Sequence, residues 1–498
     1  MQTALKLAAA GSLAAAFLFT IHTAEGQSTA SPAANAPHQD KAIAQQACPH
    51  SGFTAAMKRQ QQPNAGIETA EPTDDCEFHQ WAWENFAWAT APDQNGRPRF
   101  LSLTTPNDLV SGSNHAQAGE LVLSTRVHKS DGKREGAGAI VEADGNMLVG
   151  PNGYPVYASV HMNDSYAKTA KENLIANGNY LRNLGTDPYF EVGAAVFKAT
   201  WMRIDSVKDA PAGAFVTDAK VPVLTFDPKN PGMVVVKTDA TTGKPVTVSA
   251  KVALVGLHVV GFSKGHPEFL WATFEHHLNT PRLFDNDFAN QCPQQQGCAA
   301  YSPEPFTFYQ AGTPYSNVNI ATDTTPPAAP VLTFHEKTQT FSPVSNALQE
   351  NMTGGETNSP NGPQNIFNLN SAAHHFLRGE SAKNEFANYD LIGTVWFQPN
   401  VYTNENRSAA LQMNQAQAVG SVNLANSTAE TFVQSPTDQT SPANLGNCFA
   451  CHNAQSYVEP ASGPLQSLPR RRVAISHVLA VHSPYEVTNT IPAASPAP

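Results

Sequence analysis

Residues 246–262 restrict the fold most, because as a β-strand this stretch is apolar on both faces. Side chains alternate between the two faces of a strand, so a strand that is apolar on both must be covered on both. One face carries Val252, Leu254, Gly256, His258 and Val260, and the other carries Ala253, Val255, Leu257 and Val259. The stretch therefore predicts a central strand within a larger sheet.

The surrounding sequence continues the β pattern. Runs rich in Val, Thr and aromatic residues are separated by turn signals such as Asn230-Pro231-Gly232 and Thr242-Gly243. Strands are expected at 147–149, 155–162, 190–204, 222–226, 233–237, 265–277 and 389–397, with a short one at Leu101 and Leu103. Helices are expected at 53–61, 77–88, 164–181 and 372–385, and loop or linker at 325–330 and 351–365. We therefore expect an α+β fold with a β-rich main domain.

Near the carboxyl end, Cys448-Phe449-Ala450-Cys451-His452 has the spacing of a c-type haem attachment site. Each thiol adds across one vinyl group of the porphyrin, and the two intervening residues let both sulfurs reach neighbouring pyrroles. The imidazole that follows then binds the iron on its proximal side. The motif predicts one covalently attached haem c, with Cys448, Cys451 and His452 binding the cofactor and His452 as an iron ligand.

Two other uses of paired cysteines fit this sequence less well. A structural zinc site needs further Cys or His residues at finger-like spacing, and the nearest later histidine, His477, has no close pair. A thioredoxin-like redox pair belongs at the start of an α/β unit. Here the polar, proline-containing stretch with Ser435-Pro436 and Ser441-Pro442 leads into the motif.

The sequence leaves the second axial ligand of the iron open. Small soluble cytochromes use a methionine that follows the motif, but no methionine follows His452 in this chain. The candidates are His477, His482, Met413, a residue of the large domain, or no ligand at all. We prefer His477 as the second metal ligand because residues 473–480 are apolar, as a haem face requires, although a buried core histidine fits the same pattern.

Residues 77–88 carry three of the six tryptophans. Phe78, Trp81 and Trp88 fall on one face of the expected helix, which predicts an amphipathic core helix. A sharper hypothesis is that this helix also covers the edge of the haem.

The amino terminus predicts export. Residues 1–26 combine Lys6, an apolar run of about 15 residues and a small-residue cleavage site, which is the pattern of a signal peptide. That run is too short to span a bilayer; an uncleaved anchor is the alternative. Haem attachment to this motif in bacteria takes place outside the cytoplasmic membrane, so a periplasmic or otherwise exported location is expected.

The cysteine count agrees with an oxidising compartment. Of six cysteines, the four outside the haem motif can form two disulfides in three pairings. We prefer Cys48–Cys76 and Cys292–Cys298, since the second pair closes a short polar loop.

Charge restricts the partners. The formal net charge is −11 and only 14% of residues are charged, so nucleic acid and anionic membrane surfaces are poor partners. No segment after the leader has the length of a membrane span. A redox partner protein is compatible with this charge.

Three classes of function follow from a haem on a large body. The preferred one is electron transfer by six-coordinate iron. The alternative is a peroxidase- or oxidase-type haem enzyme, in which the large domain forms an open distal site for a small-molecule substrate and Glu275 or His276 acts as acid or base. A third class is a binding protein whose haem is structural or senses a gas. A second metal site is a further hypothesis, from His258, His266, His276 and His277 with Glu268 and Glu275.

Beyond the haem motif, two parts of the chain resemble large single-haem cytochrome c family proteins of bacteria. These parts are residues 422–432 with 475–477, and residues 256–261 with 267–276. The resemblance covers most of the mature chain and implies haem and export.

The expected organisation has five parts. Residues 1–26 form the signal peptide, 27–45 a disordered leader, 46–400 a mixed β-rich body, 401–490 the haem-bearing segment and 491–498 a tail. We expect the haem-bearing segment to be short, mostly helical or irregular, and docked on the body, because it is too small and polar to enclose a haem alone.

Overall fold

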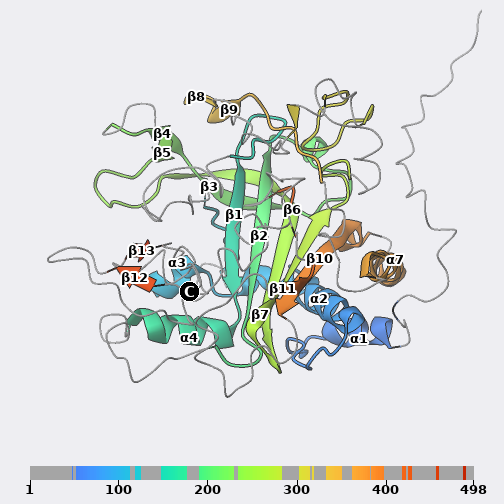
Figure 1. The fold of residues 1–498 in the computed structure, drawn as a ribbon. Helices are drawn as coiled ribbons and strands as arrows, with labels where there is room; N and C mark the ends of the chain where they lie inside the picture. The colour runs from blue at the N-terminus through green and yellow to red at the C-terminus, as the bar shows by residue number, and fades with distance from the viewer. Residues whose placement is uncertain are drawn as a thin grey trace, which may run out of the picture. The chain divides into compact units, whose positions relative to one another are not determined.

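A seven-stranded sheet forms the centre of the computed structural model (Figure 1). The structure describes residues 48, 52–112, 118–124, 147–175, 190–228, 234–282, 302–314, 317–318, 332–349, 362–381, 383–397, 418–421, 424, 426–428, 456–458 and 486–488. By their contacts, Gln46–Pro498 belong to one unit.

The sheet is antiparallel throughout. Its order is β1 (Val156–Met162), β2 (Ala195–Ile204), β6 (Thr247–Ser263), β7 (His266–His276), β10 (Tyr389–Phe397) and β11 (Ala418–Gly420), and β3 (Val216–Pro222) pairs with the first half of β6. Three two-stranded sheets accompany it: β4 (Leu224–Phe226) with β5 (Val234–Val236), β8 (Thr333–His335) with β9 (Thr340–Ser342), and β12 (Ser456–Val458) with β13 (Glu486–Thr488). A β-rich body is thereby confirmed.

Strand β6 holds the central position that its sequence predicts. It pairs with β2 along one edge, and along the other edge with β3 over residues 247–253 and with β7 over residues 256–263. From Val252 to Val260 every residue is buried except His258, which is half-buried. Residues 265–277 likewise form a strand, β7, as expected from their aromatic content.

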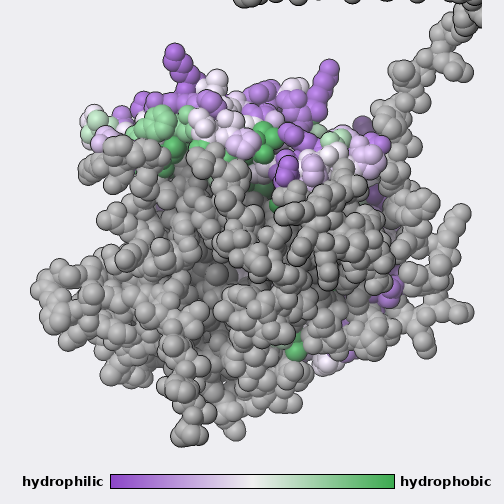
Figure 2. All heavy atoms as spheres, turned by 45° about the horizontal axis from the view of Figure 1, so that its top comes forward, coloured by the Kyte–Doolittle hydropathy of each residue, from purple (hydrophilic) through white to green (hydrophobic). Residues whose placement is uncertain are grey.

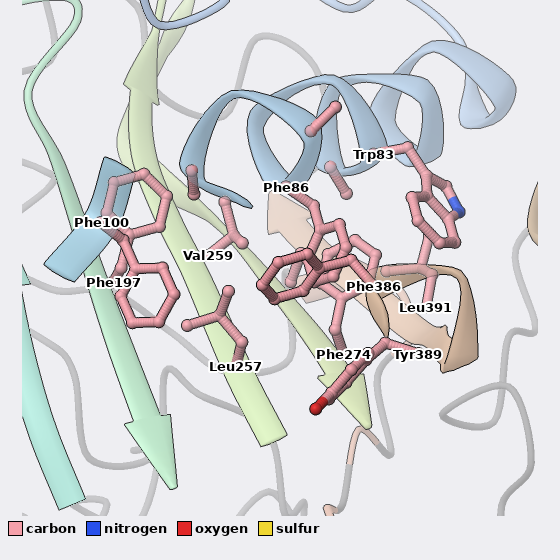
Figure 3. Close-up of a cluster of buried hydrophobic side chains, with 14 of the residues drawn as sticks. Trp83, Phe86, Phe100, Phe197, Leu257, Val259, Phe274, Phe386, Tyr389 and Leu391 are labelled. Carbon is pink, nitrogen blue, oxygen red and sulfur yellow. The ribbon is translucent and has the colours of Figure 1, made fainter. Parts of the chain in front are cut away.

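One side of the sheet, here called the first face, is covered by helices. These are α1 (Phe53–Gln60), α2 (Asp75–Thr90) and α7 (Gly362–Glu380), which lie together in Figure 1. Trp83 and Phe86 of α2 pack on Phe274 of β7, and the Phe86 and Phe274 rings stack with centroids 4.2 Å apart (Figure 3). This aromatic layer forms the main hydrophobic core.

Helix α2 is a core helix, as predicted, but it is not amphipathic. Nearly every residue from Phe78 to Thr90 is buried. The reason is a second cover on the outer side of the helix, the arm formed by residues 61–73. The indole N–H groups of Trp81 and Trp88 donate to the arm carbonyls of Glu68 and Ala65, at 3.0 and 2.7 Å.

Helix starts follow local capping signals. The Asp74 carboxylate accepts the Glu77 N–H at the start of α2. Asn163 accepts the Tyr166 N–H at the start of α4 (Asp164–Ile175), within the range where a helix was expected. Thr105 and Asp108 form a capping box at the start of α3 (Pro106–Ser111), a helix that the sequence analysis did not anticipate.

Three local expectations were wrong. Residues 147–149 form only an isolated bridge, between Val149 and Pro155, and not a strand. Leu101 belongs to the 3₁₀ helix η1 (Arg99–Ser102) and not to a strand, because bonds among Asp93, Arg97 and Ser102 close a tight turn there. Helix α7 begins at Gly362, inside the stretch expected to be linker, and buries Ile366 and Leu369 in the core. Shorter 3₁₀ turns lie at η3 (Val207–Asp209) and η5 (Glu385–Asn388).

The described surface is largely polar on the side shown in Figure 2, with small hydrophobic areas among hydrophilic ones. None of the helices in the described part of the chain has the length and apolar character that a membrane crossing requires.

Candidate functional site

The predicted haem residues Cys448, Cys451, His452 and His477 lie outside the described residues, as do Met413 and His482. Cys292 and Cys298 also lie outside them. The donor set of Cys448, Cys451 and His452, which is two thiols and an imidazole at the spacing of covalent attachment, suits a haem c. The structure describes the chain on both sides of the motif.

After the motif, β12 and β13 bring two parts of the chain together. Ser456 pairs with Thr488, and Val458 pairs with Glu486. Ser456 follows His452 by four positions in the sequence. The ladder therefore brings residues 486–488 beside residues that closely follow the predicted attachment site in the chain.

Before the motif, the described residues between Ser421 and Thr428 lie on the side of the sheet opposite α2, here called the second face. Successive side chains of a strand point to opposite faces. Phe274 packs against α2, so the next residue, Glu275, points to the second face, where it binds Ser427. Thr394 likewise bonds His79 of α2, whereas its neighbour Gly393 faces Ser421. Helix α2 and residues Ser421 and Ser427 thus lie on opposite faces.

The described residues between Ser421 and Thr428 cross the second face from β10 towards β2. Ser421 donates its N–H to Thr394 O at 2.9 Å and accepts the Thr394 N–H at 3.2 Å on its hydroxyl. Further along, the hydroxyls of Thr428 and Thr200 are 3.1 Å apart. Ser421, Leu424, Asn426, Ser427 and Thr428 are all buried.

Glu275 is the acidic group of this site. Its carboxyl accepts the Ser427 N–H at 2.7 Å on one oxygen and the Ser427 hydroxyl on the other. Burial raises the pKa of Glu275 to about 7, although both bonds from Ser427 and the positive charge of Arg282 act in the opposite direction. The negative charge of Asp390, its direct cross-strand neighbour, acts with burial.

Asp390 carries the negative charge of this pair. Arg282 donates to one of its oxygens, and His374 Nε2 lies 3.2 Å from the other. Although burial opposes ionisation, the Arg282 guanidinium holds the pKa of Asp390 well below its usual range. The two adjacent carboxyls therefore differ in charge: Asp390 is ionised at neutral pH, whereas Glu275 is poised between its two forms.

The histidines expected to form a second metal site are not gathered into one group, although His276 and His277 stack with ring centroids 4.8 Å apart. Among the described residues, no group of three or more His, Cys, Asp or Glu side chains could hold a metal ion. His266 bonds Glu268 at 2.9 Å, and His258 bonds Thr273 at 2.8 Å, in separate pairs. Burial lowers the pKa of His276 to about 3, so this imidazole is neutral in the core.

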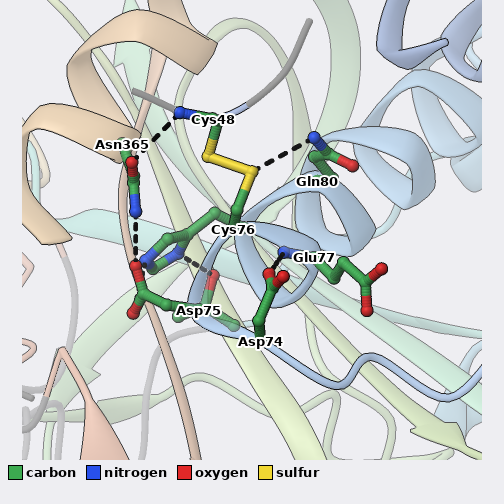
Figure 4. Close-up of a disulfide and its surroundings, with 9 residues drawn as sticks. Cys48, Asp74, Asp75, Cys76, Glu77, Gln80 and Asn365 are labelled. Carbon is green, nitrogen blue, oxygen red and sulfur yellow. Dashed lines mark hydrogen bonds and ion pairs between the residues drawn. A yellow bond between two sulfur atoms is a disulfide. The ribbon is translucent and has the colours of Figure 1, made fainter. Parts of the chain in front are cut away.

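One predicted disulfide is present. Cys48 and Cys76 are bonded, which ties the start of the described chain to the first turn of α2 (Figure 4). The Cys48 N–H donates to the side chain of Asn365 at 3.2 Å, and Asn365 donates to Asp75 at 2.8 Å. The bridge therefore also joins α7 to this corner.

Sequence reasoning missed most of the groups around Glu275. Ser427, Asp390, Arg282 and Gly393 have no local pattern that marks them, because their partners are distant in the chain. The available signal was the resemblance over residues 422–432, which contain Ser427. No protein-family model, curated protein or solved structure matches this chain.

Proposed function

We propose that this protein is an exported c-type cytochrome with a single haem that transfers electrons to or from a redox partner protein. The observation that carries the proposal is the motif Cys448-Phe449-Ala450-Cys451-His452. Its two thiols hold the haem covalently, and His452 binds the iron. The bound haem supplies a one-electron centre whose potential depends on its ligands and surroundings.

Two structural features support this proposal. The Cys48–Cys76 disulfide agrees with the oxidising compartment in which such haems are attached. The β12–β13 pairing brings Glu486–Thr488, which follow His477 in the chain, beside Ser456–Val458, which follow His452. We propose His477 as the second iron ligand because the sequence around it, residues 473–480, is apolar.

The enzymatic alternative has less support from the described residues. An acid–base group must reach a substrate proton. Both carboxyl oxygens of Glu275 are engaged by Ser427, and Glu275 and His276 are buried. We therefore prefer electron transfer to peroxidase or oxidase chemistry at this pair.

The test is spectroscopic. The mature protein should give a reduced pyridine-haem spectrum typical of thioether-linked haem, and acidified acetone should leave the pigment on the protein. Ferrous wild-type protein should not change its bands with carbon monoxide, because both axial positions are filled. His477→Ala should create a carbon monoxide-sensitive iron, whereas the matched variant His482→Ala should behave as wild type.

Three results would count against the proposal. A colourless mature protein, or a pigment that acetone extracts, rejects covalent haem. Binding of carbon monoxide by the wild type points to the enzyme or gas-sensor class. A wild-type spectrum in His477→Ala rejects that residue as ligand while leaving the haem in place.

A further inference from the structure

We propose that Glu275 is the positioning residue that seats the haem-bearing segment on the second face of the sheet, by holding both the backbone and the side chain of Ser427. The link to haem rests on the proposed function, but the seating itself does not.

Two hydrogen bonds that are buried away from water join Glu275 to Ser427. One carboxyl oxygen accepts the Ser427 N–H at 2.7 Å, and the other accepts its hydroxyl. Glu275 is 3% exposed and Ser427 is fully buried, so water cannot replace either bond. A buried donor that loses its acceptor is costly, and this pair therefore fixes where residue 427 meets the sheet.

The sheet is shaped to receive the segment on either side of this contact. Gly393 and Gly256 face it from β10 and β6, the two neighbours of β7. A Cβ atom at Gly256 would lie 2.6 Å from the Thr428 hydroxyl and 2.7 Å from the Thr200 hydroxyl. A Cβ atom at Gly393 would overlap the Ser421 side chain. Two positions without side chains therefore let residues 421–428 approach the strands closely.

The contact between Glu275 and Ser427 can form in both protonation states of the carboxyl. The facing charged groups are Arg282, which follows β7, and Asp390 on β10. An ionised carboxylate accepts both Ser427 donors, whereas a neutral carboxyl accepts the N–H and donates its own proton to the hydroxyl. The seat thus depends on the shape of the carboxyl group and not on its charge.

Holding Ser427 in place restricts where the chain that leads to the haem attachment site begins. Ser427 precedes Cys448 by 21 residues (448 − 427). The chain that carries the attachment site therefore starts from a fixed point on the second face, and a variant that frees residue 427 should alter the haem surroundings as well as the segment.

The experiment compares hydrogen–deuterium exchange at residues 418–428 with the absorption spectrum of the haem. In Glu275→Leu, which keeps the volume but removes both acceptors, exchange at the Ser427 amide should rise roughly 5- to 150-fold. Glu275→Gln keeps an acceptor and a donor in the same places, so it should restore protection to near the wild-type level. Thr394→Val is the matched control, because its hydroxyl lies on the same sheet but faces His79 of α2.

A second pair of variants covers the case in which Glu275→Leu does not fold. Ser427→Ala removes one bond from the other partner, and Gly393→Ala displaces Ser421 without touching Glu275. Both should raise exchange across 418–428 and shift the haem bands. Unchanged exchange in all three variants overturns the seating. Raised exchange with an unchanged haem spectrum overturns the positional link, whereas a wild type without haem contradicts only the proposed function.

Discussion

The buried carboxyl of Glu84 offers a quantitative test of the fold around α2. Burial raises its pKa from 4.5 to about 8, and the nearby negative charge of Glu68 and a hydrogen bond to it act in the same direction, while Arg59 opposes them. Glu68 belongs to the arm that covers α2, and its N–H donates to Asn85 at 2.9 Å. Glu84 is therefore protonated at neutral pH and should ionise only in alkaline solution.

The direction in which stability changes with pH follows from the difference in the pKa of Glu84 between the folded and unfolded states. Because the pKa of Glu84 is higher in the folded chain than the unfolded value of 4.5, its contribution to stability is complete below pH 4.5 and is lost as pH rises to about 8. With about 1.4 kcal/mol per pKa unit, the folded state loses about 4 kcal/mol relative to the unfolded state between pH 5 and pH 9.

Glu84→Gln removes this dependence, because glutamine is neutral in both states and can still donate to Glu68. Relative to wild type, the variant should gain about 4 kcal/mol in free energy of unfolding between pH 5 and pH 9. Urea denaturation of both mature proteins at the two pH values measures the difference. Glu77→Gln, the same change at an exposed position of α2, is the control. A wild-type-to-variant difference that stays constant across this range refutes a neutral, buried Glu84.

Two further predictions concern stability. The Cys48→Ser/Cys76→Ser double variant should lower the free energy of unfolding by about 3–4 kcal/mol, as the chain-entropy model gives for the sequence separation of 28; equal denaturation midpoints for variant and wild type would contradict it. Asp390→Asn should cost about 3 kcal/mol at pH 7, because Arg282 loses its buried partner. Since the pKa of Asp390 is depressed in the folded state, its contribution is present above the unfolded value of 3.8 and fades below it. The difference in free energy of unfolding between wild type and Asp390→Asn should therefore be about 1 kcal/mol smaller at pH 3 than at pH 7 in the same denaturation assay. An equal difference at both pH values would show that Asp390 is not ionised in the folded protein.

Local sequence predicted most of the strands, but it did not predict the arm at residues 61–73 that covers the outer side of α2. Residues 252–260 specify a central strand because both of their alternating faces are apolar, and β6 has that position. The same logic predicted a one-sided α2, yet the arm at residues 61–73 buries the other side as well. The aromatic residues of α2 signal burial, but nothing in their spacing shows which part of the chain lies over them.

The candidate site divides in the same way. The haem motif is a contiguous pattern with its own chemistry, so five adjacent residues suffice to predict an attached haem. The second metal site was a hypothesis from composition, and the structure separates its histidines into different pairs. His276 and His277, which are adjacent in sequence, do stack with ring centroids 4.8 Å apart, but His258 and His266 bond other partners.

By itself, the sequence determined the periodic elements, the central strand, the Cys48–Cys76 partnership as one of few choices, and the motif that predicts haem. Each of these depends on residues that are close in the chain or on a small set of alternatives. Only the tertiary structure decided that Glu275 meets Ser427, 152 positions away, and that Gly256 and Gly393 leave room for the crossing segment. Burial and charge environment depend on which distant groups pack together, and packing is a property of the whole fold.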